Sequence, residues 1–556
     1  MVDSTQWSAD ALERLCRHYG ISATYFDAFG TQRHATPENL AALLAEFGVQ
    51  AGAAPGDVAE PAIPPVLVVA AQAPHWSVHL PRQGHLAGKL RWQLRDEEGR
   101  LSDGEADAHA LHDGGCVLHL GESLAPGYHW LRIDGLDGET MVVASPGRCY
   151  RPPAVRDGGR VWGPAVQLYA LRSPRNWGIG DFTDLDTLID SMAGQGADVV
   201  GLNPLHALFP TDPQRASPYS PSSRQRLNVL YIDVEAVDDF AACEPARRRV
   251  ESPEFQARLA ALREAPLVDH AGVAAAKFEV LELLFDHFRT HHLLRAGGPD
   301  AAGKAFLDFV AEQGEPLRRH ALFEALQAHF AAADPQCWGW LVWPEAYRDI
   351  DSPAVQEFAA QHADRLQYHQ YLQWLAERQL ARAGARCEAL GMGIGLYLDL
   401  AVSVDRGGSD AWGAQHCFAV GASIGAPPDE FNPAGQNWGL PPLRPDRLRA
   451  NHYQPFVQML RENMRHAGAL RIDHVMGLMR LFWIPPGRTA HDGAYVRYAV
   501  DEMLAIVAME SHRHRCMVVG EDLGTVEDAM RDALARADVL SYRLLYFEKQ
   551  GSGFTP

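Results

Sequence analysis

Apolar runs alternate with helical stretches along the chain after Pro153. Six of these runs have the composition of buried strands, and most of them end in a polar residue or a glycine. They are Val166–Leu171, Val199–Asn203, Ile394–Asp399, Ala469–Asp473, Met517–Glu521 and Tyr542–Phe547. Alternating strands and helices predict an α/β fold with a parallel sheet, and polar residues at strand ends are typical of the active-site face of a (β/α)8 TIM-type barrel. A doubly wound open sheet is the alternative, but no G-x-G-x-x-G turn follows the first run.

The second run ends at Asn203 and the third begins only at Ile394, so a large insertion separates them. Amphipathic helical patterns fill much of it, which predicts a helical subdomain at about 240–390 within a barrel domain at 160–556. The helical stretches are Phe278–Phe288, Ala321–Phe330 and Gln367–Leu380. With six strands rather than eight, we expect the barrel to be incomplete at its C-terminus.

The first part of the chain, residues 1–50, is predicted to be helical from 8 to 48. Thr36 is placed as an N-cap, Pro37 stands in the first turn, and Gly48 is placed to end the second helix. Its two apolar stripes consist of Leu12, Leu15 and Tyr19, and of Leu40, Leu43, Leu44 and Phe47. A linker rich in Ala, Pro and Gly follows from 51 to 65.

Residues 62–150 predict a β-sandwich-like domain, because short apolar runs are separated by turn residues. The clearest runs are Val66–Val69, Trp76–Leu80, Leu90–Leu94 and Tyr128–Ile133. Two functions remain open for this domain, a carbohydrate-binding module or a packing domain. We favour packing, because the sequence does not place an aromatic stripe on a solvent-facing surface.

Composition narrows the possible partners. Fifty basic residues oppose seventy acidic ones, which gives a net charge of −20. Nucleic acid and anionic membranes select basic surfaces, so neither is expected as a partner. Thirteen Trp and sixteen Tyr suit the stacking of sugar rings, although most aromatic residues in a large protein fill its core.

Eight scattered cysteines form no C-x-x-C pair, so neither a zinc site nor a disulfide framework is predicted. The first residues, Met1 to Trp7, lack the pattern of a secretion signal, and no apolar run is long enough for a membrane span. We therefore expect a cytoplasmic location. His512 and His514 have no obvious ligand partners, so no metal is expected there. The glycines between Trp177 and Asp181 lack the Gly-Lys-Ser/Thr of a phosphate loop; we expect a tight turn, with Asp181 starting a helix.

Two strand ends carry candidate catalytic groups. Arg471 and Asp473 are two residues apart, so they share one face of a strand, and the arginine can hold the carboxylate ionised. Glu521 closes the next run and is expected to project into the barrel mouth, while Asp522 or Thr525 is a candidate N-cap for the following helix. A structural ion pair is the alternative for the first group. Together, however, the two carboxylates fit the pair that retaining glycosidases hold about 5–5.5 Å apart.

Five segments resemble, in the same order, those of the amylomaltases, which are 4-alpha-glucanotransferases or disproportionating enzymes. The segments are Ser217–Arg224 (SPYSPSSR), Pro427–Phe431 (PPDEF), Gly435–Pro442 (GQNWGLPP), Arg471–His474 (RIDH) and Gly520–Gly524 (GEDLG). The resemblance extends from about Gly163 to the last residue, and the N-terminal blocks resemble the extension of longer bacterial members. It implies transfer of α-1,4-glucan segments between maltooligosaccharides.

The resemblance also implies roles for individual residues. Asp473 corresponds to the nucleophile and Glu521 to the general acid/base. The residues expected to bind substrate are Tyr219, Arg471, His474, Asp429, Asn437, Trp438 and Asp399. The loop from 427 to 442 corresponds to one that overhangs the acceptor site, although Trp438 could instead anchor the loop. No metal, nucleotide or organic cofactor is implied.

One expected residue is missing from the pattern. The family carries a third essential Asp after a Thr-His pair, and no such motif follows Phe547. Asp492 lies between the two other carboxylates in sequence, in the wrong order, and is expected to be a loop residue. We therefore expect the chain as written to be a truncated form, weakly stable and inactive. The alternatives to a transferase are an α-1,4-glucan hydrolase and a glucan-binding protein without activity.

Overall fold

The computed structural model describes residues 7–27, 30–50, 61–81, 83–86, 88–524, 526–550 and 553–554. The chain divides into two compact units. Unit 1 comprises Met1–Arg151, His416–Met464 and Arg471–Pro556, and unit 2 comprises Pro152–Gln415 and Arg465–Leu470. Among the helices described, none has the length and apolar character needed to cross a membrane.

The barrel strands form one six-stranded sheet with the order β11-β12-β15-β18-β21-β22. Its members are β11 (Ala165–Val166), β12 (Val199–Leu202), β15 (Gly395–Leu400), β18 (Ala469–Ile472), β21 (Met517–Gly520) and β22 (Leu540–Ser541). The pairs β11–β12, β12–β15 and β21–β22 are parallel. The strand β18 contributes residues to both units, because the division falls between Leu470 and Arg471. The four middle strands agree with the apolar runs of the sequence.

The first and last strands are shorter than predicted. After Val166 the chain turns into a short 3-10 helix over Leu168–Ala170, because the amide of Leu168 donates to the side chain of Asn203 rather than continuing the sheet. The last strand, β22, lies just before the predicted run Tyr542–Phe547, and within that run Leu545–Phe547 is a 3-10 helix.

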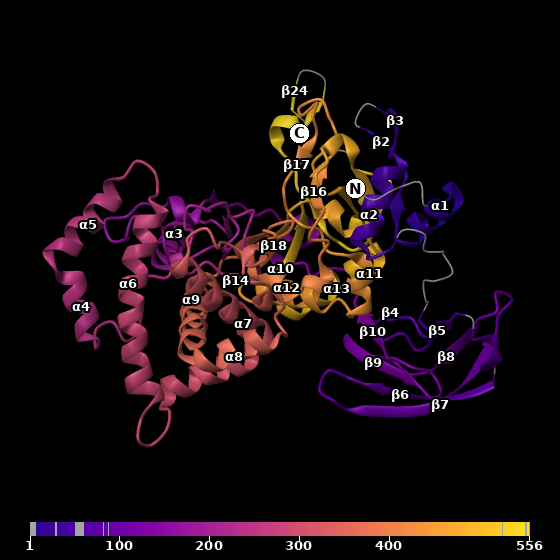
Figure 1. Ribbon diagram of the computed structural model, residues 1–556, viewed down its shortest axis with the longest axis horizontal. Helices are drawn as coiled ribbons and strands as arrows, with labels where there is room; N and C mark the ends of the chain where they lie inside the picture. Colours follow the sequence, from indigo (N-terminus) through magenta and orange to yellow (C-terminus); the bar gives the residue numbers. More distant parts are fainter. Residues whose placement is uncertain are drawn as a thin grey trace. The chain divides into compact units, whose positions relative to one another are not determined.

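The insertion in unit 2 is helical, as predicted (Figure 1). The three amphipathic stretches lie in α6 (His270–Phe288), α7 (Ala301–Ala333) and α9 (Ala363–Ala389), and the further helices of the region are α4 (Glu244–Glu251), α5 (Pro253–Glu264) and α8 (Pro353–Gln361). The helices α7 and α9 pack along each other and bury aromatic rings such as Phe306 and Trp374, whose centroids are 5.6 Å apart.

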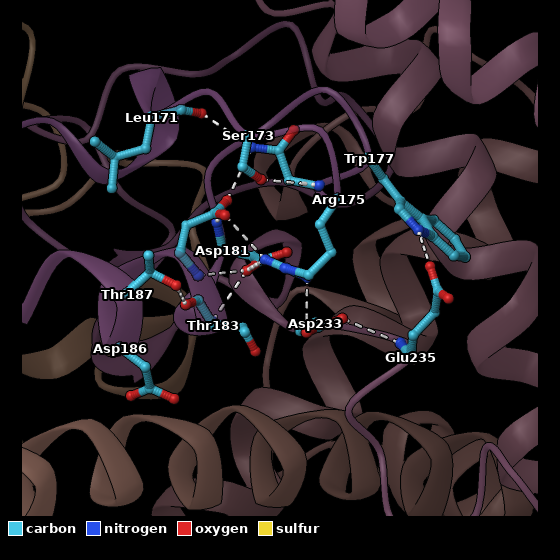
Figure 2. Close-up of polar contacts among 12 residues, drawn as sticks. Leu171, Ser173, Arg175, Trp177, Asp181, Thr183, Asp186, Thr187, Asp233 and Glu235 are labelled. Carbon is cyan, nitrogen blue, oxygen red and sulfur yellow. Dashed lines mark hydrogen bonds and ion pairs between the residues drawn. The ribbon is translucent and has the colours of Figure 1, made fainter. Parts of the chain in front are cut away.

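The turn after β11 is held by a buried charge network (Figure 2). Asp181 is the N-cap of α3 (Phe182–Ala193) and accepts from the amides of Thr183 and Asp184, which confirms the predicted helix start. The guanidinium of Arg175 bonds to Asp181, to Asp184 at 3.0 Å and to Asp233 at 2.8 Å. The glycine-containing turn is therefore fixed by side chains from three segments of unit 2.

The N-terminal segment of unit 1 is helical only at its two ends. The helices α1 (Ala9–His18) and α2 (Pro37–Glu46) flank the short strands β1 (Ile21–Ser22), β2 (Thr24–Phe26) and β3 (Gln32–His34), which the helical prediction missed. The N-cap role of Thr36 is confirmed, since its hydroxyl accepts from the amide of Asn39. The strand β1 pairs with β20, at the edge of a five-stranded antiparallel sheet. That sheet has the order β1-β20-β19-β16-β17, with β16 (Ser423–Ala426), β17 (Gln436–Asn437), β19 (Arg480–Ile484) and β20 (Ala494–Arg497).

Seven strands form the sheet of residues 62–150, in the order β4-β10-β9-β6-β7-β8-β5 (Figure 1). They are β4 (Val66–Ala70), β5 (Trp76–Leu80), β6 (Gly88–Arg95), β7 (Leu101–Ala110), β8 (Cys116–Leu120), β9 (Gly127–Ile133) and β10 (Thr140–Ser145). All four predicted runs are strands. The strands β7, β8 and β10 were not among the predicted runs. For β7 the reason is that most of its residues are exposed or half-buried and therefore polar or small. The core of this sheet includes Val78, Leu80, Leu118 and Leu131, all fully buried.

Candidate active site

The carboxyl end of β18 presents an arginine–aspartate pair. Arg471 donates to Oδ1 of Asp473 at 2.7 Å, and the two side chains are 17% and 21% exposed. Burial raises the pKa of Asp473, while the charge and hydrogen bond of Arg471 oppose that rise. Asp473 is therefore a carboxylate held by one cation and still reachable by a ligand.

Glu521 follows directly on β21 and lies against the same strand end. Its Oε2 accepts from the amide of His474 at 3.0 Å, and its Oε1 accepts from the amide of Leu523 at 2.8 Å. Burial raises its pKa, and the negative charge of Asp473 raises it further, against the lowering effect of the two amides and of Arg471. A carboxyl with a raised pKa keeps its proton to higher pH, which suits a general acid.

A left-handed backbone at His474 links the two carboxylates. His474 has φ +50°, a conformation that is rare for residues with a side chain. This conformation accompanies the bond from its amide to Glu521, while the amide of Glu521 donates to the carbonyl of Ile472 and the amide of Val475 donates to the carbonyl of Glu521, both at 3.0 Å. Gly520 permits this close approach, since a Cβ there would lie 2.9 Å from the side chain of Val475.

The imidazole of His474 packs against the loop of residues 427–442. Its ring lies 5.1 Å from the ring of Trp438 in an edge-to-face arrangement. Burial and the charge of Arg480 lower the pKa of His474 to about 4, so the ring is neutral near pH 7. Trp438 is half-buried and also donates from Nε1 to Gln436. Trp438 thus contacts both the predicted site residue His474 and its own loop.

Two other predicted loop residues use their side chains to shape the loop. Asp429 accepts from the amides of Phe431 and Asn432, and Asn437 accepts from the amide of Gly439. These bonds show that both side chains stabilise the loop, and their contacts with substrate remain predictions.

In unit 2, two predicted residues lie together. The hydroxyl of Tyr219 donates to Oδ2 of Asp399 at 2.9 Å, at the end of β15. Asp399 is buried, at 7% exposed, whereas Tyr219 is 42% exposed. The tyrosine ring is thus oriented by a buried carboxylate and presents an accessible aromatic face, which is the arrangement that suits stacking on a sugar ring.

Some residues differ from the sequence interpretation. Asp522 is not a helix cap: it accepts from the hydroxyl of Ser541, and α14 (Asp528–Arg536) begins after Glu527. Thr525 lies outside the described residues. Asp492 is in a loop, in a 3-10 turn capped by Thr489.

Tyr542 was missed as a site residue. The guanidinium of Arg471 lies 5.4 Å from its ring, and its amide donates to the carbonyl of Gly520. Its aromatic ring was the only signal in the sequence. Among the residues that the structure describes, no cluster of three or more His, Cys, Asp or Glu could hold a metal ion.

Comparison with known proteins shows to which class of protein the chain belongs. A family profile described as 4-alpha-glucanotransferase matches residues 166–556, and one described as the MalQ N-terminal beta sandwich domain matches residues 62–146. The chain is 43% identical over 473 residues to a 4-alpha-glucanotransferase of Haemophilus influenzae, covering 84% of this chain and 66% of the relative. It is 36% identical over 568 residues to one of Mycobacterium tuberculosis, covering 97% and 76%.

The amylomaltase of Corynebacterium glutamicum has a similar structure, with a TM-score of 0.81 and 29% identity over 99% of this chain and 77% of that chain. Together with the carboxylate pair on barrel strand ends, these matches define the class as amylomaltase-type glucan transferases. The chain belongs to the 4-alpha-glucanotransferase family. The resemblance and the barrel fold class predicted from the sequence are confirmed. The chain spans about two thirds of the length of its Haemophilus relative.

Proposed function

We propose that this protein transfers segments of α-1,4-glucan between maltooligosaccharides by a double displacement. In the first half-reaction, Asp473 attacks the anomeric carbon and forms a glycosyl ester, while Glu521 donates its proton to the departing glycosidic oxygen. In the second, the ionised Glu521 takes the proton from the 4-hydroxyl of an incoming glucan. That oxygen attacks the anomeric carbon, the ester bond breaks, and the configuration is retained.

The single observation that carries this proposal is the coupling of the two carboxyls at adjacent strand ends. Glu521 accepts from the amide of the residue that follows Asp473, and the charge of Asp473 contributes to the raised pKa of Glu521. Arg471 stabilises the ionised form of Asp473. Burial raises the pKa of both carboxyls, but only Asp473 has a cation bonded to it, which favours Asp473 as the nucleophile and Glu521 as the acid.

The remaining residues have binding roles in this proposal. Tyr219, oriented by Asp399, stacks on the sugar in the donor site, and the loop of residues 427–442 covers the acceptor site through Trp438. Covering the site orients the incoming hydroxyl and excludes water, so that transfer competes with hydrolysis. The substrates are therefore maltooligosaccharides and longer α-1,4-glucans.

Release of fluoride from α-maltosyl fluoride tests the proposal, because fluoride leaves without protonation and only the nucleophile is essential. We expect the protein and its Glu521→Gln variant to release fluoride, and Asp473→Asn to release almost none. Equal rates in all three would refute the assigned roles. Asp492→Asn is the matched control, since this carboxylate caps a loop turn.

Incubation with maltotriose addresses the requirement for a third Asp. A ladder of glucose and longer maltooligosaccharides would show that transfer proceeds without the Thr-His-Asp motif. Unchanged maltotriose, together with fluoride release from the activated donor, would show that natural substrates need that group. Glucose and maltose without longer products would favour a hydrolase.

A further inference from the structure

The sheet of residues 62–150 has no fully exposed tryptophan or tyrosine among the residues described. Its exposed large apolar side chains are Leu101 and Leu111, the rings of Trp76 and Tyr128 are buried, and those of Trp92 and Trp130 are half-buried. Sugar-binding surfaces present accessible aromatic faces. The features that point to a function of this sheet lie instead on its buried side.

The strand β10 is buried on both faces. All six of its residues are buried; Val142 and Ala144 belong to the core of the sheet, and the opposite face packs on α13 (Val500–His514). In α13, every residue from Met503 to Ser511 is buried. The helix α13 is therefore buried along most of its length, and the sheet packs against one of its sides.

Polar contacts fix the helix to the sheet along its length. Ser145 donates to the carbonyl of Ala505 at 3.1 Å, and the hydroxyl of Tyr128 donates to Glu510 at 2.8 Å. Glu510 is fully buried. Burial acts to raise its pKa, but His514 and the charges of Arg461 and Arg513 outweigh this effect and lower the pKa. A buried carboxylate that loses a partner costs about 1–3 kcal/mol or more, so these contacts specify one position of the helix.

The same contacts continue to the strand that carries Glu521. The amide of Tyr150 donates to the hydroxyl of Ser511 at 2.8 Å, and that hydroxyl donates to the carbonyl of Cys516 at 2.5 Å. Cys516 directly precedes β21, which ends at Gly520, and Glu521 follows. A chain of two hydrogen bonds therefore joins the end of the sheet to the start of the catalytic strand.

The neighbouring strand is held from the same segment. The amide of Cys149 donates to the carbonyl of Ala537 at 2.7 Å, and Arg151 pairs with Asp538. Ala537 and Asp538 lie just before β22, whose Leu540 is paired with Val519 of β21. Residues 145–151 thus bond to α13 and to the segment before β22, and they reach the segment before β21 through the hydroxyl of Ser511.

We propose that the N-terminal sheet positions the general acid, with Tyr128 and Ser511 as positioning residues that fix the height of β21 and hence of the Glu521 carboxyl. The inference rests on the proposed role of Glu521. It assigns the sheet a part in the reaction rather than in binding glucan.

Leaving-group dependence tests this role, because a proton from Glu521 is needed for a poor leaving group and not for a good one. The substrates are phenyl α-maltoside and dinitrophenyl α-maltoside, with Glu521→Gln as the reference. In Ser511→Ala and Tyr128→Phe, we expect the phenyl maltoside rate to fall roughly ten- to a hundredfold, the scale of a misplaced catalytic group. The dinitrophenyl maltoside rate should stay near that of the unsubstituted protein. Thermal unfolding identifies a variant that has not folded, and Tyr128→Phe, which keeps the ring, then carries the test.

Ser77→Ala is the control, since it removes an exposed hydrogen bond to His119 in the same sheet. It should leave both rates unchanged. An equal fall for both substrates in the positioning variants, or no fall in either, would overturn the inference. If Glu521→Gln itself showed no selective loss, the proposed function of Glu521 would fail, which is a separate result.

Discussion

Two arginine–carboxylate clusters follow strands of the same sheet, and they differ in how many partners each carboxylate has. Arg175 bonds to three aspartates whose side chains are only 2% to 6% exposed (Figure 2). In that cluster Asp181 and Asp233 also accept from backbone amides. Asp473 has one described partner, Arg471, and is 21% exposed. The first cluster satisfies its oxygens internally, whereas the second leaves one carboxylate oxygen for a ligand.

The comparison shows why residue type alone does not separate structure from chemistry. Both clusters contain an Arg and an Asp that follow a strand of the sheet, and a structural ion pair was the alternative considered for Arg471 and Asp473. Both clusters also contain a carboxyl whose pKa is raised by burial and by a neighbouring carboxylate, Asp181 in the first and Glu521 beside the second. What distinguishes Asp473 is its exposure, since its side chain is 21% exposed and that of Asp181 only 2%. A catalytic carboxylate must be reachable by its substrate, whereas a structural one need not be.

The largest effect on activity is expected when the charge of Asp473 is removed. Asp473→Asn should lower fluoride release from α-maltosyl fluoride on the order of 10⁴-fold, because an amide cannot form the ester. Thermal stability should be unchanged or raised, since a half-buried charge is lost. Asp233→Asn should leave the rate of the folded protein unchanged. A wild-type rate in Asp473→Asn would remove the distinction between the clusters.

Removing Arg175, which bonds to three aspartates, should lower stability rather than activity. Arg175→Met removes the cation that bonds directly to three buried carboxylates and leaves them only the charge of the nearby Lys277, and we expect a loss of about 3–5 kcal/mol. The midpoint of thermal unfolding measures it. Arg471→Met is the matched change and should cost less stability, because water reaches Asp473, while it impairs fluoride release. Equal destabilisation by the two changes would contradict this difference.

Another buried carboxyl, that of Glu324, has no cation beside it among the residues that the structure describes, and it sharpens the comparison. Glu324 in α7 is 3% exposed, burial raises its pKa from 4.5 to about 8, and no hydrogen bond to its Oε1 is found among the described residues. Between these pH values the folded state keeps a proton that the unfolded state releases. Stability should therefore fall as pH rises from about 4.5 to about 8, by up to a few kcal/mol at about 1.4 kcal/mol per pKa unit.

Glu324→Gln should remove this dependence. We expect its unfolding midpoint to match the unsubstituted protein near pH 4.5 and to exceed it at pH 8. A difference that stays constant with pH would show that Glu324 titrates normally.

The smallest effect concerns the loop that packs on His474. Trp438→Ala should raise the ratio of hydrolysis to transfer by roughly tenfold or less, because water enters the acceptor site. The ratio is measured from the products of α-maltosyl fluoride with maltose as acceptor. Trp162→Ala, an exposed tryptophan of unit 2, is the control. An unchanged ratio in Trp438→Ala would assign the ring to loop packing alone.

Local signals predicted much of the fold and of the site. The runs ending at Asn203, Asp399, Asp473 and Glu521 became strands because each is a short apolar segment that a parallel sheet can bury. The helix starts at Thr36 and Asp181 also followed from local capping chemistry. Non-local contacts were not predictable in this way. The turn after Val166 depends on the side chain of Asn203, and the pairing of β1 with β20 joins segments far apart in the sequence.

The site shows the same limit. Sequence placed Asp473 and Glu521 on neighbouring strands, but the left-handed conformation of His474 and the cation–ring contact of Arg471 with Tyr542 arise only on folding. The position of Asp522 was wrong because a hydroxyl on β22 competes for its carboxylate.

Mass spectrometry of a trapped intermediate tests the central claim most directly. Glu521→Gln incubated with α-maltosyl fluoride should gain the mass of one maltosyl group, because the ester forms and its breakdown lacks a base. Peptide mapping should find that group on Asp473, and the double variant with Asp473→Asn should gain nothing. An adduct on another residue, or fluoride release without any adduct and with inverted product, would contradict the account.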